Sequence, residues 1–158
     1  MNKKQLLLNI SIGIAILAVL AVVLVKFVLP WKSGNQYQFR DFEKIVVYNT
    51  DGKTIPLSSI VSKAESTYCF LFNMNDCFTC IAKGIEDLES LKKSGKKAIG
   101  LMVHDNIKEV KGWASTYEFS PFYSIKRSEV YEHIILPKLP VMLEIKNNEI
   151  ENIRYIHL

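Results

Sequence analysis

The chain has 158 residues, of which 49% are hydrophobic and 23% charged, and its formal net charge at pH 7 is +4. This length has room for one domain and an appendage. Four of the 20 basic residues lie in the first 32 positions and no acidic residue precedes Asp41, so the rest of the chain carries equal numbers of each charge. Because a neutral domain lacks the basic surface that nucleic acid requires, we expect no nucleic-acid partner.

The N-terminal segment is strongly apolar. Residues 6–29 contain one charged side chain, Lys26, and about 20 such residues suffice to span a bilayer. The run is longer than the apolar region of a signal peptide, which has about 7–15 residues, and no small-residue cleavage site follows it. The sequence therefore predicts an uncleaved anchor over residues 1–32, with a transmembrane helix at about 6–29, and a separate domain over residues 33–158.

Strand and helix patterns alternate after this segment. In chain order, the sequence predicts a strand at 45–48, a hairpin turn at 49–53, a returning strand at 54–57, a helical turn at 58–61, a strand at 68–72, a helix at 81–93 and a strand at 97–103. It then predicts a helix that Asp105 caps and that runs to about Tyr117, an aromatic segment at 119–123, a helix at about 128–135, and a final hairpin of 139–146 and 149–156. The aromatic segment is expected to pack as core and loop, and the alternative is that it lines a groove for a partner. Strands that alternate with helices predict an α/β domain with a mixed sheet.

A Cys-x-x-Cys motif, Cys77-Phe78-Thr79-Cys80, lies between a predicted strand and a predicted helix. The first cysteine is therefore expected at a helix N-terminus, where unpaired N–H groups and the helix dipole favour the thiolate. The thiolate is the nucleophile in disulfide exchange, so we interpret the motif as a redox site. The charge of the neighbouring Asp76 has the opposite effect and raises the pKa of Cys77. The alternative is that Asp76 or Asn75 simply caps the helix.

A structural zinc site is the main competing interpretation of the cysteines. Such a site needs four ligands, and the remaining candidates are isolated in the sequence: Cys69, His104, His133 and His157. We therefore expect no metal and no cofactor. Cys69 lies inside an apolar strand and is interpreted as an inert buried residue. His104 ends a strand, where a surface or capping role is the more common one.

These features together resemble the thioredoxin superfamily, and in particular the membrane-anchored thioredoxin-like proteins of the TlpA/ResA type. The Asp51-Gly52-Lys53 hairpin and the following Pro56-Leu57-Ser58-Ser59-Ile60 are similar to the segment with which the domain of that family begins. The run from Leu139 to Glu149 is similar to the family segment whose proline is cis and faces the cysteine pair. The resemblance spans residues 39–155 and implies a thioredoxin-like fold, with a mixed central sheet flanked by helices after one transmembrane helix.

The resemblance also implies a function. Proteins of this type are single-pass membrane thiol-disulfide oxidoreductases with an extracytoplasmic, periplasmic domain. They reduce client proteins, for example in cytochrome c maturation or metal-centre assembly, and a membrane electron donor recharges them. Cys77 would then be the attacking thiolate and Cys80 the resolving cysteine, the two forming a redox-active disulfide. Leu139 and Pro140 would hold an extended segment of the substrate beside the sulfur atoms.

Several residues depart from the family pattern. Asp76 stands in place of the familiar tryptophan, Leu71 in place of a buried carboxylate, and Phe78-Thr79 in place of Gly-Pro, which leaves the redox direction open. Three other functions remain alternatives. A copper-handling chaperone would be expected to have Cys-x-x-x-Cys, a peroxidase would have threonine where Met74 stands, and a non-catalytic module would bind partners without exchange.

Overall fold

The computed structural model describes residues 37–136 and 138–156. The predicted anchor over residues 1–32, with its transmembrane helix at about 6–29, lies outside these residues, and so does His157. Within the described ranges, no helix is both long enough and apolar enough to cross a membrane.

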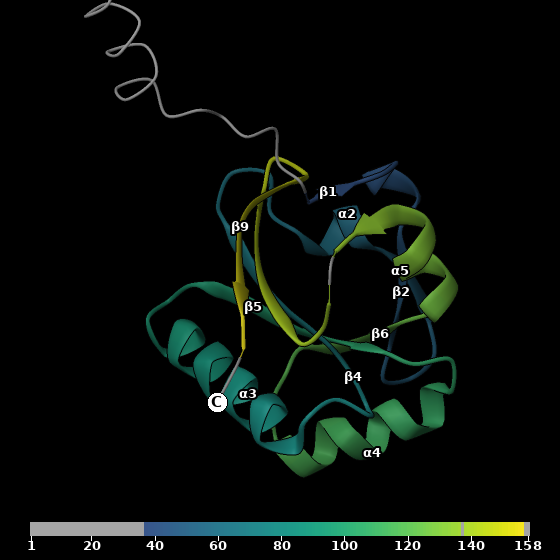
Figure 1. Ribbon diagram of the computed structural model, residues 1–158, viewed down its shortest axis with the longest axis vertical. Coiled ribbons are helices and arrows are strands. Elements are labelled where there is room, and N and C mark those ends of the chain that lie inside the picture. The colour runs from purple at the N-terminus through teal and green to yellow at the C-terminus, as the bar shows by residue number, and fades with distance from the viewer. Residues whose placement is uncertain (1–36, 137, 157–158) are drawn as a thin grey trace, which may run out of the picture. The chain divides into compact units, whose positions relative to one another are not determined.

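The described chain alternates strands and helices, as Figure 1 shows. The strands are β1 (Gln38–Phe39), β2 (Val46–Asn49), β3 (Thr54–Pro56), β4 (Thr67–Asn73), β5 (Lys97–Val103), β6 (Phe122–Ile125), β7 (Ile134–Ile135), β8 (Val141–Lys146) and β9 (Glu149–Tyr155). The helices are the 3-10 helix η1 (Phe42–Lys44) and the α-helices α2 (Leu57–Ile60), α3 (Phe78–Lys93), α4 (Ile107–Tyr117) and α5 (Arg127–His133).

Seven strands form one mixed sheet in the order β3-β2-β6-β5-β4-β8-β9. The three central strands β6, β5 and β4 are parallel, and the strands on either side are antiparallel to their neighbours. Leu71 of β4 is paired with Leu101 of β5 and with Val141 of β8. The mixed α/β arrangement predicted from the sequence is confirmed.

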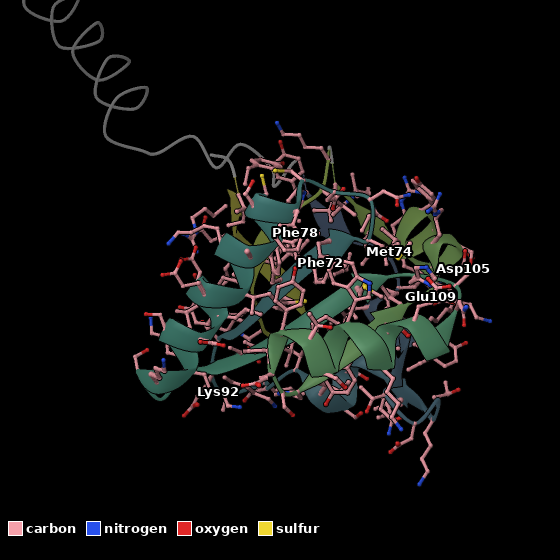
Figure 2. All side chains as sticks on the ribbon, turned by 90° about the horizontal axis from the view of Figure 1, so that it is seen from below. Phe72, Met74, Phe78, Lys92, Asp105 and Glu109 are labelled. Atoms are coloured by element: carbon pink, nitrogen blue, oxygen red, sulfur yellow. The ribbon has the colours of Figure 1, made fainter. Side chains whose placement is uncertain are left out.

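The two faces of the sheet carry separate apolar clusters, because successive side chains of a strand point to opposite faces. On one face Leu71 and Leu101 pack with α2 and α5. On the other face Phe70, Phe72 and Met102 pack with α3 and α4. Phe72 lies between these last two helices (Figure 2). The sheet therefore holds α3, the helix that carries the cysteine pair, against a fully apolar surface.

A glycine allows α3 to lie close to the sheet. Phe70 is fully buried, and a Cβ atom added to Gly84 of α3 would lie 2.1 Å from its ring. Because two carbon atoms in contact need about 3.5–4.0 Å, no larger residue fits at this crossing without displacing the helix or the ring.

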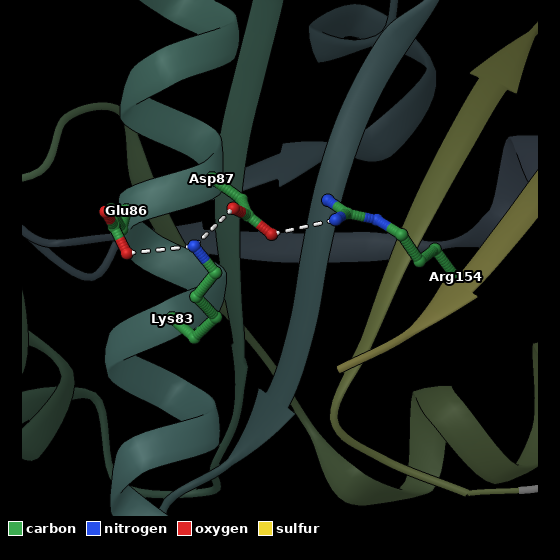
Figure 3. A network of polar contacts seen from close by, with 4 residues as sticks. All are labelled: Lys83, Glu86, Asp87 and Arg154. Carbon is green, nitrogen blue, oxygen red and sulfur yellow. Dashed lines mark hydrogen bonds and ion pairs between the residues drawn. The ribbon is translucent and has the colours of Figure 1, made fainter. Parts of the chain in front are cut away.

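An ion-pair network also ties α3 to the last strand (Figure 3). The Asp87 carboxylate of α3 forms two ion pairs. One is with Lys83 of the same helix at 3.3 Å, and the other is with Arg154 of β9 at 2.9 Å. Lys83 also contacts Glu86 at 3.1 Å. Lys83 and Arg154 are both exposed, so each pair adds at most about 1 kcal/mol of stability. The network fixes geometry more than it stabilises the fold.

Both predicted hairpins are confirmed. β2 and β3 are antiparallel around the Asp51-Gly52 turn, and Gly52 has a φ of 83°. Asn147 and Asn148 connect β8 and β9 with φ angles of 51° and 64°. Positive φ at both central residues is the type I′ geometry that suits the twist of a two-stranded hairpin.

Two predicted elements differ in the structure. The aromatic segment at 119–123, predicted to pack as core and loop, overlaps β6 (Phe122–Ile125), which pairs with both β5 and β2. The helix predicted at 128–135 ends at His133, and Ile134–Ile135 forms β7, which pairs with Gln38–Phe39 in a separate two-stranded sheet. Both strands are too short to show a period in the sequence, and their pairing partners lie far away along the chain.

The predicted role of Asp105 is also wrong. Its carboxylate does not cap α4 but accepts a hydrogen bond at 3.2 Å from the backbone N–H of Arg127, the first residue of α5. The helix begins two residues later, at Ile107. The Asp105 side chain therefore contacts the start of α5 and not the start of α4, the helix that follows it in the chain.

Candidate functional site

The cysteine pair lies at the edge of the sheet where the parallel strands end. β4 ends at Asn73, a short loop follows, and Cys77 is the residue that precedes the first turn of α3. Cys77 is exposed, whereas Cys80, one turn further along, is only 8% exposed. Neither cysteine forms a disulfide within the part of the chain that the structure describes. The expected position of the motif at the helix N-terminus is confirmed.

The surroundings of Cys77 favour its thiolate. Hydrogen bonds lower its pKa to about 7: the largest effect comes from the Cys80 side chain, followed by the Thr79 hydroxyl and the Cys80 backbone N–H. The Cys77 Sγ atom lies 3.0 Å from the Thr79 Oγ1 atom. Donors that point at a developing negative charge stabilise it, so near pH 7 much of this thiol is ionised.

Asp76 does not cap α3. The residue at the cap position is Cys77, and no side chain accepts a capping hydrogen bond there. The Asp76 carboxylate instead accepts the backbone N–H of Asn73 at 2.6 Å, which closes the loop between β4 and α3. Partial burial raises the pKa of Asp76, against the lowering effect of this hydrogen bond. The capping hypothesis is therefore wrong, and of the two opposed effects on the Cys77 pKa, which the sequence left undecided, the lowering one prevails.

The other residues of interest in β4 are inert. Cys69 is 1% exposed, and burial raises the pKa of its thiol to about 12, so it stays protonated at neutral pH. Leu71 is fully buried in the apolar cluster on the α2 and α5 face. The interpretation of Cys69 as a buried hydrophobe is confirmed.

Leu139 and Pro140 lie at the same edge of the sheet as the cysteine loop. The peptide bond between them is cis. β8 begins one residue later, with Val141 opposite Leu71 of the antiparallel strand β4. Continuing this register brings Leu139 and Pro140 to the end of β4, from which the chain leads to Cys77. Both residues are half-buried and thus partly accessible from solvent.

His104 also reaches this edge. It lines a cavity of about 240 Å³ together with Asn75 and Asp76 of the cysteine loop. Its Nδ1 atom accepts the backbone N–H of Asn106 at 2.8 Å, and its Nε2 atom lies 2.9 Å from a carboxylate oxygen of Glu109. These contacts hold the ring in place.

The second described histidine has a different environment. His133 is buried on α5, with its Nε2 atom 4.0 Å from the Glu129 carboxylate. Over residues 37–136 and 138–156, no three Cys, His, Asp or Glu side chains gather in a group able to hold a metal ion.

Two residues between the cysteines contribute features that sequence reasoning missed. Thr79 donates to or accepts from the Cys77 thiol, and Phe78 is a large apolar side chain that is 67% exposed. The one signal in the sequence that could have pointed to these two residues is their position between the cysteines. Periodicity could not reveal it, because the first turn of a helix has side-chain directions that depend on the entry geometry.

We expect the Thr79→Val variant to have a higher Cys77 pKa than the wild type, because it loses the hydroxyl at 3.0 Å from the sulfur. Since only the thiolate reacts, alkylation by iodoacetamide at pH 7 should then be slower, and its pH profile should shift to higher pH. The matched control is Thr54→Val on β3, at the far edge of the sheet. An unchanged profile in Thr79→Val would contradict this account of the thiolate.

No protein-family model matches the sequence, and no curated protein matches it. Solved structures do match the fold. A secreted Mycobacterium tuberculosis disulfide oxidoreductase homologous to E. coli DsbE has a TM-score of 0.52 at 9% identity, covering 72% of this chain and 84% of that one. A thiol:disulfide interchange protein from Bacteroides sp. has a TM-score of 0.53 at 10% identity, covering 69% and 75%. Arabidopsis thaliana ScoI with copper bound has a TM-score of 0.53 at 10% identity, covering 70% and 85%.

These similarities define the class of fold. The described part of the chain has a thioredoxin-like α/β fold, with a mixed sheet flanked by helices. At identities this low the likeness shows the fold alone, and function has to be argued from the residues of the site.

Proposed function

We propose that the chain is a single-pass, membrane-tethered thiol-disulfide oxidoreductase that uses the Cys77–Cys80 pair to reduce client disulfides on the extracytoplasmic, periplasmic side. One observation carries this proposal: an exposed thiol with a pKa of about 7 lies one helical turn from a buried thiol. A nucleophilic thiol has its optimum for exchange when its pKa is near the ambient pH.

The reaction takes two steps. The Cys77 thiolate attacks one sulfur of the client disulfide, so that a bond forms between Cys77 and the client while the client disulfide breaks and releases a thiolate. Cys80 then loses its proton and attacks the Cys77 sulfur, which forms the Cys77–Cys80 disulfide and releases the second client thiolate. The client gains two electrons and takes up two protons, and the cysteine pair is oxidised.

We propose that Leu139 and Pro140, which are joined by a cis peptide bond, position the client. Leu139 and Pro140 are half-buried at the end of the sheet toward which β4 delivers the cysteine loop. Proline offers no N–H group, so in this proposal an extended client chain pairs with the carbonyl and N–H of the preceding residue, Leu139. A client segment held there would present its disulfide to Cys77.

The tether and the electron supply complete the proposal. The apolar run over residues 6–29 has the length and composition of a membrane-spanning helix. The cycle leaves the pair oxidised, so an electron donor has to return two electrons and two protons to it after each turnover, and for a tethered domain we place this donor in the membrane. We infer that this donor and the client proteins are the partners of the domain.

We expect the Cys80→Ser variant of the full-length chain to accumulate a covalent complex with its client, because the first step proceeds and the resolving thiol is absent. The complex should be seen as an added mass that dithiothreitol removes. The Cys77→Ser, Cys80→Ser double variant should form none, and Cys69→Ala should behave as the wild type.

If Cys80→Ser traps no client, exchange is the wrong function. Tight Cu(I) binding that needs both Cys77 and Cys80 would then favour a copper-handling role, since thiolates are soft ligands that select Cu(I). Retention of a partner without a covalent bond would favour a non-catalytic binding module.

A further inference from the structure

The surface beside Cys77 on the α4 side is aromatic. Among the residues that the structure describes, the large hydrophobic side chains left exposed are Phe78 at 67% and Tyr131 at 77%. Phe78 is the residue immediately after the attacking cysteine and belongs to the first turn of α3 (Figure 2). Phe78 is not isolated, because it continues into the aromatic residues Trp113 and Tyr117 of α4, and contiguous apolar surfaces mark interaction sites.

Phe78 forms one wall of a groove of about 430 Å³, and α4 forms the other. Its ring centroid is 6.4 Å from that of Tyr117. Tyr117 stacks on Trp113 at 5.5 Å with an angle of 23° between the rings, and Trp113 contacts the buried Phe72 at 6.3 Å. Because this stack rests on the core, the α4 wall of the groove is preformed, which lowers the entropic cost of binding.

The groove has room for a side chain, and a carboxylate lies in its lining. Its lining also includes Gly112, and a Cβ atom added there meets no heavy atom within 4 Å. The one ionisable carboxylate in the lining belongs to Glu109, which is held at 2.9 Å by His104 and at 2.8 Å by the Asn106 amide. A fixed negative charge at the end of an apolar groove complements an apolar residue followed by a basic one and repels an acidic one.

We propose that this groove binds the side chain next to the reactive cysteine of the client, and that it selects clients with an aromatic or large aliphatic residue there and a basic residue beyond it. The inference rests on the proposed function, because a mixed disulfide with Cys77 holds the client cysteine beside Phe78. The groove lies between the start of α3 and α4, a helix that packs against β6, whereas Pro140 precedes β8 on the other side of β4. The two surfaces therefore contact different parts of the client.

The test uses three short peptides, Cys-Phe-Lys, Cys-Ser-Lys and Cys-Phe-Glu, each blocked at both ends and joined through its cysteine to thionitrobenzoate. The reduced full-length chain attacks the peptide sulfur and releases coloured thionitrobenzoate. We expect the Phe-Lys peptide to react about tenfold faster than the Ser-Lys peptide, as for the gain or loss of one apolar group in a binding pocket. The Phe-Glu peptide should be slower than the Phe-Lys peptide.

Two variants test whether the groove causes this preference. Phe78→Ala removes one wall, and Gly112→Leu fills the space from α4, so each should bring the Phe-Lys to Ser-Lys rate ratio to within about twofold. The ratio cancels any change in the intrinsic reactivity of the Cys77 thiol, because both peptides react with the same sulfur. Tyr131→Ala, which removes an equally exposed aromatic residue from α5, should keep the wild-type ratio.

The outcomes are distinguishable. Equal rates for all three peptides in the wild type, or a preference that survives both groove variants, would overturn the groove while leaving disulfide exchange intact. A chain that self-associates, and loses this association in Phe78→Ala, would assign the groove to a second copy and overturn the client proposal. If no peptide reacts with Cys77, the proposed function itself fails, and the inference with it.

Discussion

The Cys77→Ser variant is expected to reduce disulfides at least about 10³-fold more slowly than the wild type. The serine hydroxyl is a weak nucleophile at its free pKa. Serine occupies almost the same volume as cysteine, and Cys77 is exposed, so the fold should be retained. The measurement is the initial rate of reduction of a disulfide-bonded protein at pH 7, with the free energy of unfolding measured alongside.

Cys69→Ala provides the matched control, because it removes a thiol that is 1% exposed and whose pKa is about 12. This variant should keep the wild-type rate and lose some stability, since a buried sulfur leaves a small cavity. If Cys77→Ser retained the rate and Cys69→Ala lost it, the attacking residue would have been assigned wrongly.

The Gly84→Ala variant is expected to lower the free energy of unfolding by up to about 2 kcal/mol. The added Cβ would lie 2.1 Å from the Phe70 ring, and overpacking of a well-packed core typically costs about 1–3 kcal/mol. Alanine recovers part of this cost, because it is favoured over glycine in a helix by about 1 kcal/mol. Denaturation by guanidinium, followed by circular dichroism, gives the difference.

Gly112→Ala is the control for this prediction. Gly112 also lies within a helix, but a Cβ atom there meets nothing within 4 Å. Alanine should therefore raise the stability by up to about 1 kcal/mol through helix propensity alone. Equal effects of the two substitutions would show that the contact between Gly84 and Phe70 does not position α3.

Strong periodic patterns allowed most of the fold to be predicted from the sequence. β5 has the predicted bounds, Lys97–Val103, and α3 ends at the predicted residue, Lys93. The buried strands are continuous apolar runs and the helix has an apolar stripe, which are the signals that local sequence carries best. The turn residues Asn147 and Asn148 were predicted because few other residues tolerate the positive φ that a two-residue hairpin needs.

β6 was missed because its residues do not resemble those of a buried strand. Ser124 is fully buried within the sheet and is paired with both Met102 and Tyr48. A serine in a short aromatic segment after a proline suggests a loop, and only the neighbouring strands make this one a central strand. Tertiary pairing of this kind is not encoded within a short window of sequence.

The position of the cysteine pair could be predicted, but the electrostatics of the site could not. A helix N-terminus next to a carboxylate leaves the sign of the pKa shift undecided. The sign depends on whether Asp76 turns toward the sulfur or toward the backbone N–H of Asn73, and it contacts the latter. The contact from Thr79 to the sulfur likewise depends on a side-chain rotamer that sequence alone does not determine.

The reduction potential of the Cys77–Cys80 pair tests the central claim most directly. The full-length chain is equilibrated in glutathione or dithiothreitol buffers, and the fraction of disulfide is read by thiol trapping. We predict reversible two-electron behaviour with a potential of about −250 mV or lower, in the range of a disulfide reductant. A value near about −120 mV would mark an oxidant and contradict the proposed direction. The absence of any reversible disulfide between Cys77 and Cys80 would contradict the proposal as a whole.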